Sequence, residues 1–212
     1  MFAETMAALG LDDRRDIVVV DDAKGSLAAR LWWMLSSTGR SAALLDGGLG
    51  AWRAEGLPLE RGPGPDRPKG SFQVVSWPAD RIVDADAVEV TIRVGTAPVL
   101  DVRVEERFRG EHEPIDPVAG HIPGSSNAPW ATQLDPVTGR FLAPELRRRF
   151  GELGVTGDAA ICSCGSGVTA CHGLLALKLA GFGDARVYEG SWSGWISDPD
   201  RPVATGAEER VP

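Results

Sequence analysis

The residues around Cys164 combine the features from which proteins build a reactive thiolate. An apolar stretch ends at this cysteine, and a helical pattern begins a few residues later. The residues between them are Gly165, Ser166, Gly167, Val168 and Thr169. A glycine-rich loop between a strand and a helix directs backbone N–H groups and partial positive charge toward one point, which stabilises anions and lowers the pKa of a thiol. We therefore predict that Cys164 is a nucleophile and that residues 165–169 hold an anion beside it.

The same stretch can also be interpreted as a metal site, because Cys162, Cys164, Cys171 and His172 are all metal-ligating residue types. Their spacing lacks the separation of two to four residues that is typical of zinc-binding cysteine pairs. Cys171 and His172 are adjacent, so on a helix they point in different directions. We therefore expect no metal and no cofactor, and we interpret Cys162 and Cys171 as core residues.

The composition is that of an ordinary globular protein. Of its 212 residues, 43% are apolar and 25% are charged, which suffices for one or two buried cores. The net charge of −8 opposes binding to nucleic acid or to an anionic membrane surface. No apolar run approaches the roughly 20 residues of a membrane-spanning helix, and the first residues lack a basic leader. Because the three cysteines cluster within residues 162–171, we expect no disulfide framework and a reducing, cytoplasmic setting.

An internal repeat organises the chain. Asp21 corresponds to Cys164, and Trp52 to Trp195, at a constant separation of 143 residues with no gap between. Both copies read as a strand, a tight loop, a helix, a second strand and a glycine-containing turn that leads to the tryptophan. Short apolar strands that alternate with helices predict an α/β fold with parallel strands.

The two copies differ in completeness. We expect residues 1–60 to form only the C-terminal half of a first copy, 61–75 to be a linker rich in proline and glycine, and 76–212 to form a complete second copy. The elements expected in the first copy are helices over 3–9 and 27–35 and strands over 17–20 and 42–45. Half a domain cannot bury its apolar face alone, so this copy should dock on the second copy or on another chain. A start assigned too late, a degraded gene and a functional half-domain would each explain it.

The second copy carries further recognisable elements upstream of its cysteine. Residues 99–102 are typical of a buried strand, and 120–124 of a tight turn that His121 ties together. Residues 84–94 are ambiguous by period because they are rich in Val and Ile, and we predict a helix there, with Asp84 as its N-cap and Gly95 as its C-terminal stop.

Five stretches of the chain resemble the tandem rhodanese family of sulfurtransferases. They are CGSGVTACH at 164–172, RFRG at 107–110, GHIPG at 120–124, EGSWSGW at 189–195 and DPDRPVATG at 198–206. The resemblance implies a rhodanese-like domain with a central five-stranded parallel sheet flanked by helices. In tandem members an acidic residue replaces the cysteine of the first domain, and Asp21 fits that inactive copy. The chain thus resembles an N-terminally truncated member of the 3-mercaptopyruvate/thiosulfate sulfurtransferase type.

The resemblance also implies a reaction. Cys164 would take a sulfane sulfur from a small anionic donor, hold it as a persulfide and pass it to cyanide or to a thiol acceptor such as thioredoxin. Arg107 would bind the anionic end of the donor, because its fork suits a carboxylate or the oxygens of thiosulfate. The loop contains no cationic side chain, which favours 3-mercaptopyruvate over thiosulfate. However, Ile115 stands where many mercaptopyruvate enzymes have a second arginine, so the donor stays open.

Two other functions compete with sulfur transfer. A cysteine phosphatase of related fold would need an arginine six positions after its cysteine to grip phosphate, and position 170 is Ala. This residue argues strongly against a phosphatase. The incomplete first copy favours the other alternative, a truncated or decayed paralogue that only binds partners.

Overall fold

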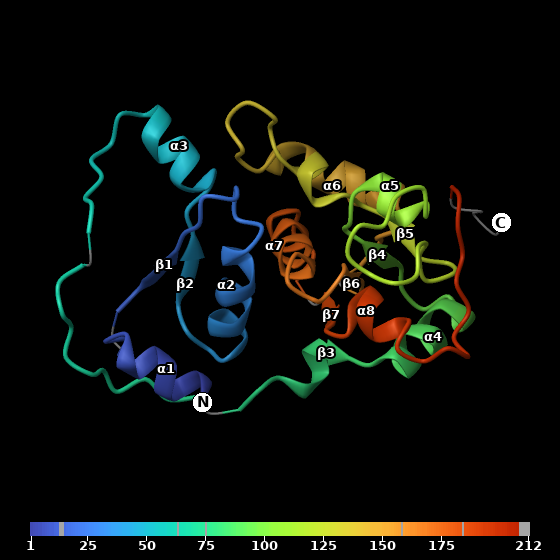
Figure 1. Cartoon of the computed structure of the whole chain (residues 1–212), viewed down its shortest axis with the longest axis horizontal. Helices are drawn as coiled ribbons and strands as arrows, with labels where there is room; N and C mark the ends of the chain where they lie inside the picture. Colours follow the sequence, from blue (N-terminus) through green and yellow to red (C-terminus); the bar gives the residue numbers. More distant parts are fainter. Residues whose placement is uncertain (13–14, 63, 75, 158, 184, 208–212) are drawn as a thin grey trace.

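The chain folds into two parallel sheets covered by helices, as the computed structural model shows (Figure 1). The structure describes residues 1–12, 15–62, 64–74, 76–157, 159–183 and 185–207. We call the part from α1 to α3 the N-terminal unit and the part from β3 to α8 the C-terminal unit. No helix in the described ranges has the length and apolar character needed to span a membrane.

The N-terminal unit is a small sheet with three helices. Its elements are α1 (Phe2–Ala8), β1 (Ile17–Val19), α2 (Ala28–Ser37), β2 (Ala42–Leu44) and α3 (Gly48–Ala54). Strands β1 and β2 are parallel, with Ile17 opposite Ala42. The helices and strands expected over 3–9, 17–20, 27–35 and 42–45 lie within two residues of α1, β1, α2 and β2.

The C-terminal unit contains a five-stranded sheet in the order β3-β7-β6-β4-β5, and every neighbouring pair is parallel. Its strands are β3 (Ile82–Val83), β4 (Val99–Asp101), β5 (Ser126–Asn127), β6 (Ile161–Ser163) and β7 (Arg186–Tyr188). Its helices are α4 (Ala85–Val94), α5 (Glu105–Phe108), α6 (Ala143–Glu152), α7 (Ala170–Leu179) and α8 (Ser191–Trp195), with short 3-10 turns at Ala79–Arg81 and Trp130–Gln133. This architecture confirms the predicted α/β class and five-stranded parallel sheet.

Helix α4 forms where the sequence predicted it, and its two ends are capped as expected. The Asp84 side chain accepts a hydrogen bond from the N–H of Ala87 at 2.9 Å. Gly95 ends the helix in the left-handed conformation, with φ of 71°. Both groups satisfy backbone atoms that a helix terminus leaves without an intrahelical partner.

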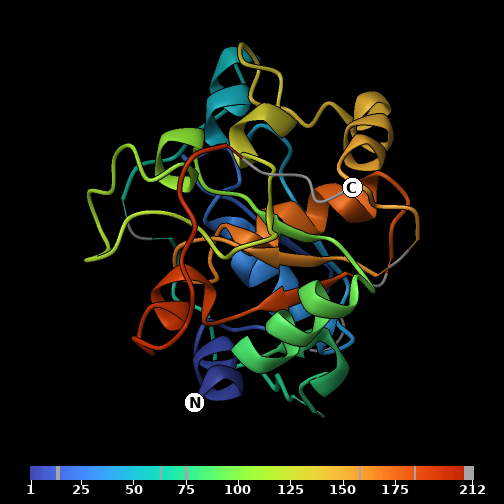
Figure 2. The ribbon, with the colours of Figure 1, turned by 90° about the vertical axis from the view of Figure 1, so that its right-hand side faces the viewer.

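Two apolar clusters cover the two faces of the larger sheet. One cluster joins α4 and α8 to the sheet and includes Val88 and Trp192, both 0% exposed. The other surrounds α7 and extends into the N-terminal unit. In Figure 2, α4 covers the near face, and α7 and the N-terminal unit lie behind the sheet.

Helix α7 is buried on nearly all sides because it is enclosed by both units. The sheet lies against one face of it, and α2 and α6 pack against the rest (Figure 1). Eight of its residues, from Ala170 to Leu177, are buried. An apolar helix without a polar face is expected for such a position. The N-terminal unit therefore buries its apolar face against α7.

Candidate active site

Cys164 lies directly after β6 and is held at the backbone by the start of α8. Its N–H donates to the Ser191 Oγ at 3.0 Å, and its carbonyl oxygen accepts the N–H of Trp192 at 3.0 Å. The Ser191 hydroxyl donates to the Tyr188 carbonyl at 2.9 Å and lies 3.9 Å from the Cys164 sulfur. Cys164 is 1% exposed, so its sulfur is enclosed at the edge of the sheet.

The Cys164 loop, residues 164–169, leads from β6 into α7 and presents a run of free N–H groups. Within the described part of the chain, the backbone N–H groups of residues 165–170 have no hydrogen-bond acceptor. Gly167 has φ of 75°, and a Cβ there would lie 2.5 Å from the Glu189 carbonyl oxygen, so a side chain does not fit. Consecutive N–H groups at a helix start form a site for an anion.

Arg107, which the resemblance implies as the residue that binds the donor, projects from α5 to the beginning of this loop. Its Nη1 and Nη2 atoms are 3.5 and 3.6 Å from the position that a Cβ on Gly165 would take. A Cβ at position 165 would therefore lie in ordinary van der Waals contact with this guanidinium. The guanidinium therefore lies beside the loop that follows Cys164.

Two carboxylates fix the orientation of Arg107. Its Nε donates to both oxygens of Glu113 at 3.0 Å, and its Nη2 donates to Asp116 at 3.0 Å. Burial raises the pKa of Glu113, but hydrogen bonds from Arg107 and from two backbone N–H groups outweigh it, and the pKa falls below its ordinary value. Nη1 has no acceptor among the described residues, so it is the donor of Arg107 that a bound anion can use.

A second arginine, Arg103, contacts Glu113, which is one of the two carboxylates that hold Arg107. Arg103 is 3% exposed and pairs with Asp101 through Nε and Nη2, while Nη2 also donates to the Gly120 carbonyl at 2.8 Å. Its Nη1 lies 3.4 Å from Glu113, the residue that also holds Arg107. A buried ion pair of this kind is stable only when the remaining polar atoms are satisfied, and these contacts satisfy them.

The Ser193 hydroxyl links the side chains that hold Arg107 to the Cys164 loop. Its hydroxyl contacts Asp116 at 2.6 Å and the carbonyl oxygen of Gly165 at 2.8 Å. Asp116 thus links Arg107 to the Cys164 loop. Sequence reasoning did not single out Asp101, Arg103, Glu113, Asp116 or Ser193 as supports. The available signal was the Asp-Val-Arg spacing after β4, which places Asp101 and Arg103 on the same side of an extended backbone.

The N-terminal unit reaches the same loop from the other side. Arg30 of α2 donates through Nη1 to the Gly167 carbonyl oxygen at 3.3 Å and lies 3.7 Å from the Cys171 sulfur. No feature of the sequence pointed to this contact. The loop is thus held by residues from both units.

Asp21 occupies the position after β1 that corresponds to Cys164 in the repeat. In the Asp21 loop, residues 21–27, its carboxylate accepts four backbone N–H groups at 2.8–2.9 Å, from Ala23, Gly25, Leu27 and Ala28. Burial raises the pKa of Asp21, but these four hydrogen bonds outweigh it and lower the pKa below its ordinary value. The loop of the N-terminal unit is therefore an anion site occupied by its own side chain.

The other two cysteines and His172 are buried, with Cys162 on β6 and both Cys171 and His172 on α7. Burial raises the pKa of the Cys162 thiol, and it raises that of Cys171 to about 11. Burial also lowers the pKa of His172 to about 4, so its ring is neutral at pH 7, and it stacks on Phe141 at 4.6 Å. Among the described residues no group of three or more His, Cys, Asp or Glu side chains is arranged to hold a metal ion.

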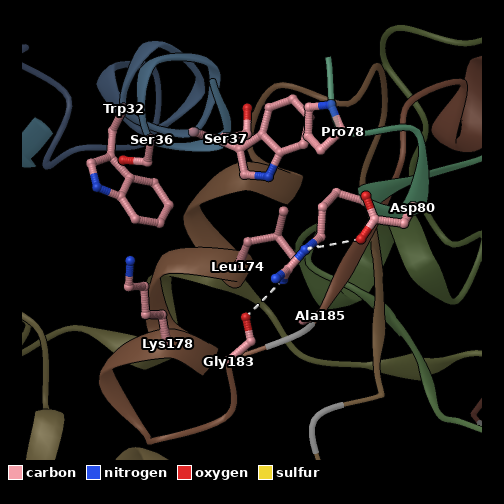
Figure 3. Close-up of a pocket in the computed structure, with 11 residues that line it drawn as sticks. Trp32, Ser36, Ser37, Pro78, Asp80, Leu174, Lys178, Gly183 and Ala185 are labelled. Carbon is pink, nitrogen blue, oxygen red and sulfur yellow. Dashed lines mark hydrogen bonds and ion pairs between the residues drawn. The ribbon is translucent and has the colours of Figure 1, made fainter. Parts of the chain in front are cut away.

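A hollow of about 390 Å³ lies between the two units (Figure 3). It opens between α2 and the C-terminal half of α7, where Lys178 Nζ lies 5.6 Å from the ring of Trp32. On the other side, Arg81 donates to the Gly183 carbonyl at 2.9 Å. The Cys164 loop precedes the opposite end of α7, so this hollow takes no part in the chemistry of the cysteine.

Comparison with known proteins places the whole chain in one group. The model of the rhodanese-like domain family matches residues 84–198. The chain is 49% identical over 207 residues to a Pseudomonas aeruginosa protein named "Probable 3-mercaptopyruvate sulfurtransferase", which covers 95% of this chain and 72% of that protein. It is 36% identical to the 3-mercaptopyruvate sulfurtransferase of Escherichia coli, again over 95% of this chain and 72% of that one.

A solved structure shows the same arrangement. The crystal structure of the Tum1 protein from Saccharomyces cerevisiae superposes with a TM-score of 0.83 at 26% identity, over 96% of this chain and 74% of that one. The match includes the N-terminal unit as well as the five-stranded sheet, since it spans nearly the whole chain. The chain therefore belongs to the rhodanese family, among the sulfurtransferases of the 3-mercaptopyruvate sulfurtransferase type.

Proposed function

We propose that this chain moves a sulfane sulfur from a small anionic donor to an acceptor through a persulfide on Cys164. The observation that carries the proposal is the run of N–H groups at residues 165–170, which follow the cysteine and have no acceptor within the described residues. A persulfide anion on Cys164 would receive hydrogen bonds from such groups, as developing anions do in acyl-transfer enzymes. The Ser166 and Thr169 hydroxyls are proposed as further donors.

The reaction has two halves. With 3-mercaptopyruvate, the Cys164 thiolate attacks the donor sulfur, the carbon–sulfur bond breaks, and the enolate of pyruvate leaves and takes the proton of the new persulfide. With thiosulfate, the same attack breaks the sulfur–sulfur bond and releases sulfite. In the second half an acceptor thiolate or cyanide attacks the outer sulfur and restores the Cys164 thiolate. No metal is required, because the charge that moves stays on sulfur, carbon and oxygen.

Arg107 is proposed to bind the donor. Its Nη1 faces Gly165, while Nε and Nη2 are held by Glu113 and Asp116, so its position is set before the donor arrives. We propose 3-mercaptopyruvate as the preferred donor, because the Cys164 loop has no cationic side chain that would meet the second charge of thiosulfate. Thioredoxin, another thiol or cyanide would be the acceptor.

We also propose a division of labour within the chain. Residues 1–60 would be an incomplete, inactive rhodanese copy, 61–75 a linker and 76–212 the catalytic domain. The built-in carboxylate of Asp21 supports the inactive role, because it takes up the N–H groups that a persulfide would need. The three free cysteines fit the reducing, cytoplasmic setting that we expect.

Mass spectrometry of the protein after incubation with 3-mercaptopyruvate tests the proposal. We expect the wild type to gain one sulfur atom on Cys164, and the gain to vanish in Cys164→Ser. The matched control is Cys162→Ser, which removes a buried thiol two residues away and should still gain the sulfur. A second incubation uses thiosulfate, and if the wild type gains no sulfur from either donor, the chain acts as a non-catalytic relative instead.

A further inference from the structure

Arg30 belongs to the N-terminal unit but contacts the loop of the reactive cysteine. Its Nη1 donates to the Gly167 carbonyl oxygen at 3.3 Å, and the Cys171 sulfur lies on the same oxygen at 3.6 Å. Its guanidinium lies 5.6 Å from the ring of Trp33, on the same helix. Arg30 does not touch the reactive sulfur by any of these contacts. Its effect on chemistry must therefore pass through the loop backbone.

The geometry of the peptide group carries that effect. A trans peptide is planar, so its C=O and N–H point in opposite directions. Because Arg30 and Cys171 hold the carbonyl oxygen of Gly167, the N–H of Val168 is turned away from them, toward the opposite side of the loop. Gly167 has φ of 75°, and a glycine reaches other conformations at little cost, so the backbone alone does not fix this peptide.

The N-terminal unit shows what the corresponding N–H group does when an anion is present. There Lys24 takes the place of Gly167, with φ of 56°, and Gly25 follows it as Val168 follows Gly167. The N–H of Gly25 donates to the Asp21 carboxylate at 2.8 Å. In the Asp21 loop, the N–H of the residue after the left-handed Lys24 thus donates to the anion.

We propose that Arg30 is a positioning residue for sulfur transfer: it holds the Gly167–Val168 peptide so that the Val168 N–H faces the persulfide on Cys164. The proposal rests on the proposed function, because it concerns the anion formed there. The N-terminal unit would thus take part in the active site, because its Arg30 binds the backbone of the Cys164 loop. A peptide that turned over would instead direct a carbonyl oxygen at the anion and destabilise it.

The test replaces Arg30 by Met, which keeps the length of the stem beside Trp33 but removes every donor. We expect the wild-type persulfide, loaded with 3-mercaptopyruvate and followed by mass spectrometry, to survive roughly tenfold longer than that of Arg30→Met. This is less than the roughly 10²–10³-fold cost of removing a donor from an oxyanion hole, because the Val168 N–H is misdirected and not removed. The kcat should fall by a similar factor with KM for the donor unchanged. Arg30→Lys, which restores a cationic donor, should recover most of the lifetime.

Arg53→Met is the matched control, because Arg53 lies in the same unit and pairs with Asp22 on the surface at 2.8 Å. It should leave the persulfide lifetime unchanged. If Arg30→Met does not fold, Arg30→Gln replaces it, since its amide ends about two bonds short of the Arg30 donor, and the same outcomes are expected.

The outcomes separate the two proposals. If the wild type acquires no sulfur, the proposed function fails. If the wild type is loaded and the persulfide of the folded Arg30 variant lasts as long, the positioning role of Arg30 is wrong while the function stands. A lifetime that Arg30→Lys fails to recover, with thermal unfolding midpoints lowered alike in both variants, would likewise overturn the positioning role and leave only a structural one.

Discussion

The Asp21 loop and the Cys164 loop are two versions of one backbone design. Each follows a parallel strand, contains a left-handed residue and leads into a helix, and α2 and α7 pack against each other. In the Asp21 loop a carboxylate takes four N–H groups, whereas in the Cys164 loop the N–H groups of residues 165–170 have no acceptor within the described residues. We therefore propose that the residue at the strand end decides whether the anion is a fixed carboxylate or a persulfide formed during the reaction.

Side-chain length relates the aspartate of one loop to the cysteine of the other. The outer sulfur of a cysteine persulfide is three bonds from Cα, and so is each carboxylate oxygen of an aspartate. Asp21 thus places a permanent negative charge about where a persulfide would place a temporary one. Under the proposed function, the Asp21 loop thereby indicates which backbone N–H groups of the Cys164 loop would meet the persulfide.

The two loops share one register, with the left-handed Lys24 and Gly167 at equivalent positions, but the helix after each loop begins at a different point. Six residues separate Asp21 from α2, whereas five separate Cys164 from α7. Gly25 is left-handed in addition to Lys24, whereas Gly167 is the left-handed residue of the Cys164 loop.

The largest effect is expected when Cys164 is replaced by aspartate, the residue at the equivalent position of the Asp21 loop. Cys164→Asp should abolish sulfur transfer completely, because no thiolate remains. Its carboxylate should accept the free N–H groups, so its unfolding midpoint at pH 7 should be at least that of Cys164→Ser. Thermal unfolding and donor turnover measure both effects. A midpoint well below that of Cys164→Ser would show that the two loops are not equivalent anion sites.

A smaller effect is expected at Arg107, which has no equivalent role in the Asp21 loop. Arg107→Ala should raise KM for an anionic donor by roughly 10–100-fold, the worth of a hydrogen bond to a charged group. Alkylation of Cys164 by a neutral reagent should persist. Arg109→Ala, two residues away on the surface, is the control and should leave KM unchanged. Unchanged donor kinetics in Arg107→Ala would remove Arg107 from the site.

The smallest effect is expected on stability, when the Asp21 carboxylate is removed. Asp21→Asn should destabilise the protein by about 1–2 kcal/mol at pH 7, because the four N–H groups lose a charged acceptor. Since the pKa of Asp21 is lowered in the folded state, its contribution is present above the ordinary value of 3.8 and is lost as the pH falls through the folded pKa. The difference between the two proteins, measured by urea unfolding, should therefore narrow below that pH. A difference that stayed constant with pH would argue against the carboxylate as its source.

The sequence predicted much of this fold because its signals are local. The repeat placed Asp21 opposite Cys164, and Asp84 and Gly95 marked the ends of α4 correctly. Each of these inferences used residues close together in the chain or a direct match between copies. The five-stranded sheet and Arg107 beside the loop came from the family resemblance.

The supports of the site could not be predicted in the same way. Arg30 meets Gly167 across 137 positions, and Ser193 meets Asp116 across 77. Such contacts depend on how the elements pack in three dimensions. A single arginine or serine in the sequence does not indicate which distant residue it will contact. Glu113 holds both Arg103 and Arg107, and only the folded chain brings these three together.

The central claim is that Cys164 carries the anion that Asp21 imitates. It is tested most directly by the mass of the intact protein after exposure to 3-mercaptopyruvate and removal of excess donor, followed by peptide mapping. We predict a gain of one sulfur atom per chain, located on Cys164 and absent from Cys164→Asp. A gain located on Cys162 or Cys171, or an equal gain in Cys164→Asp, would contradict it.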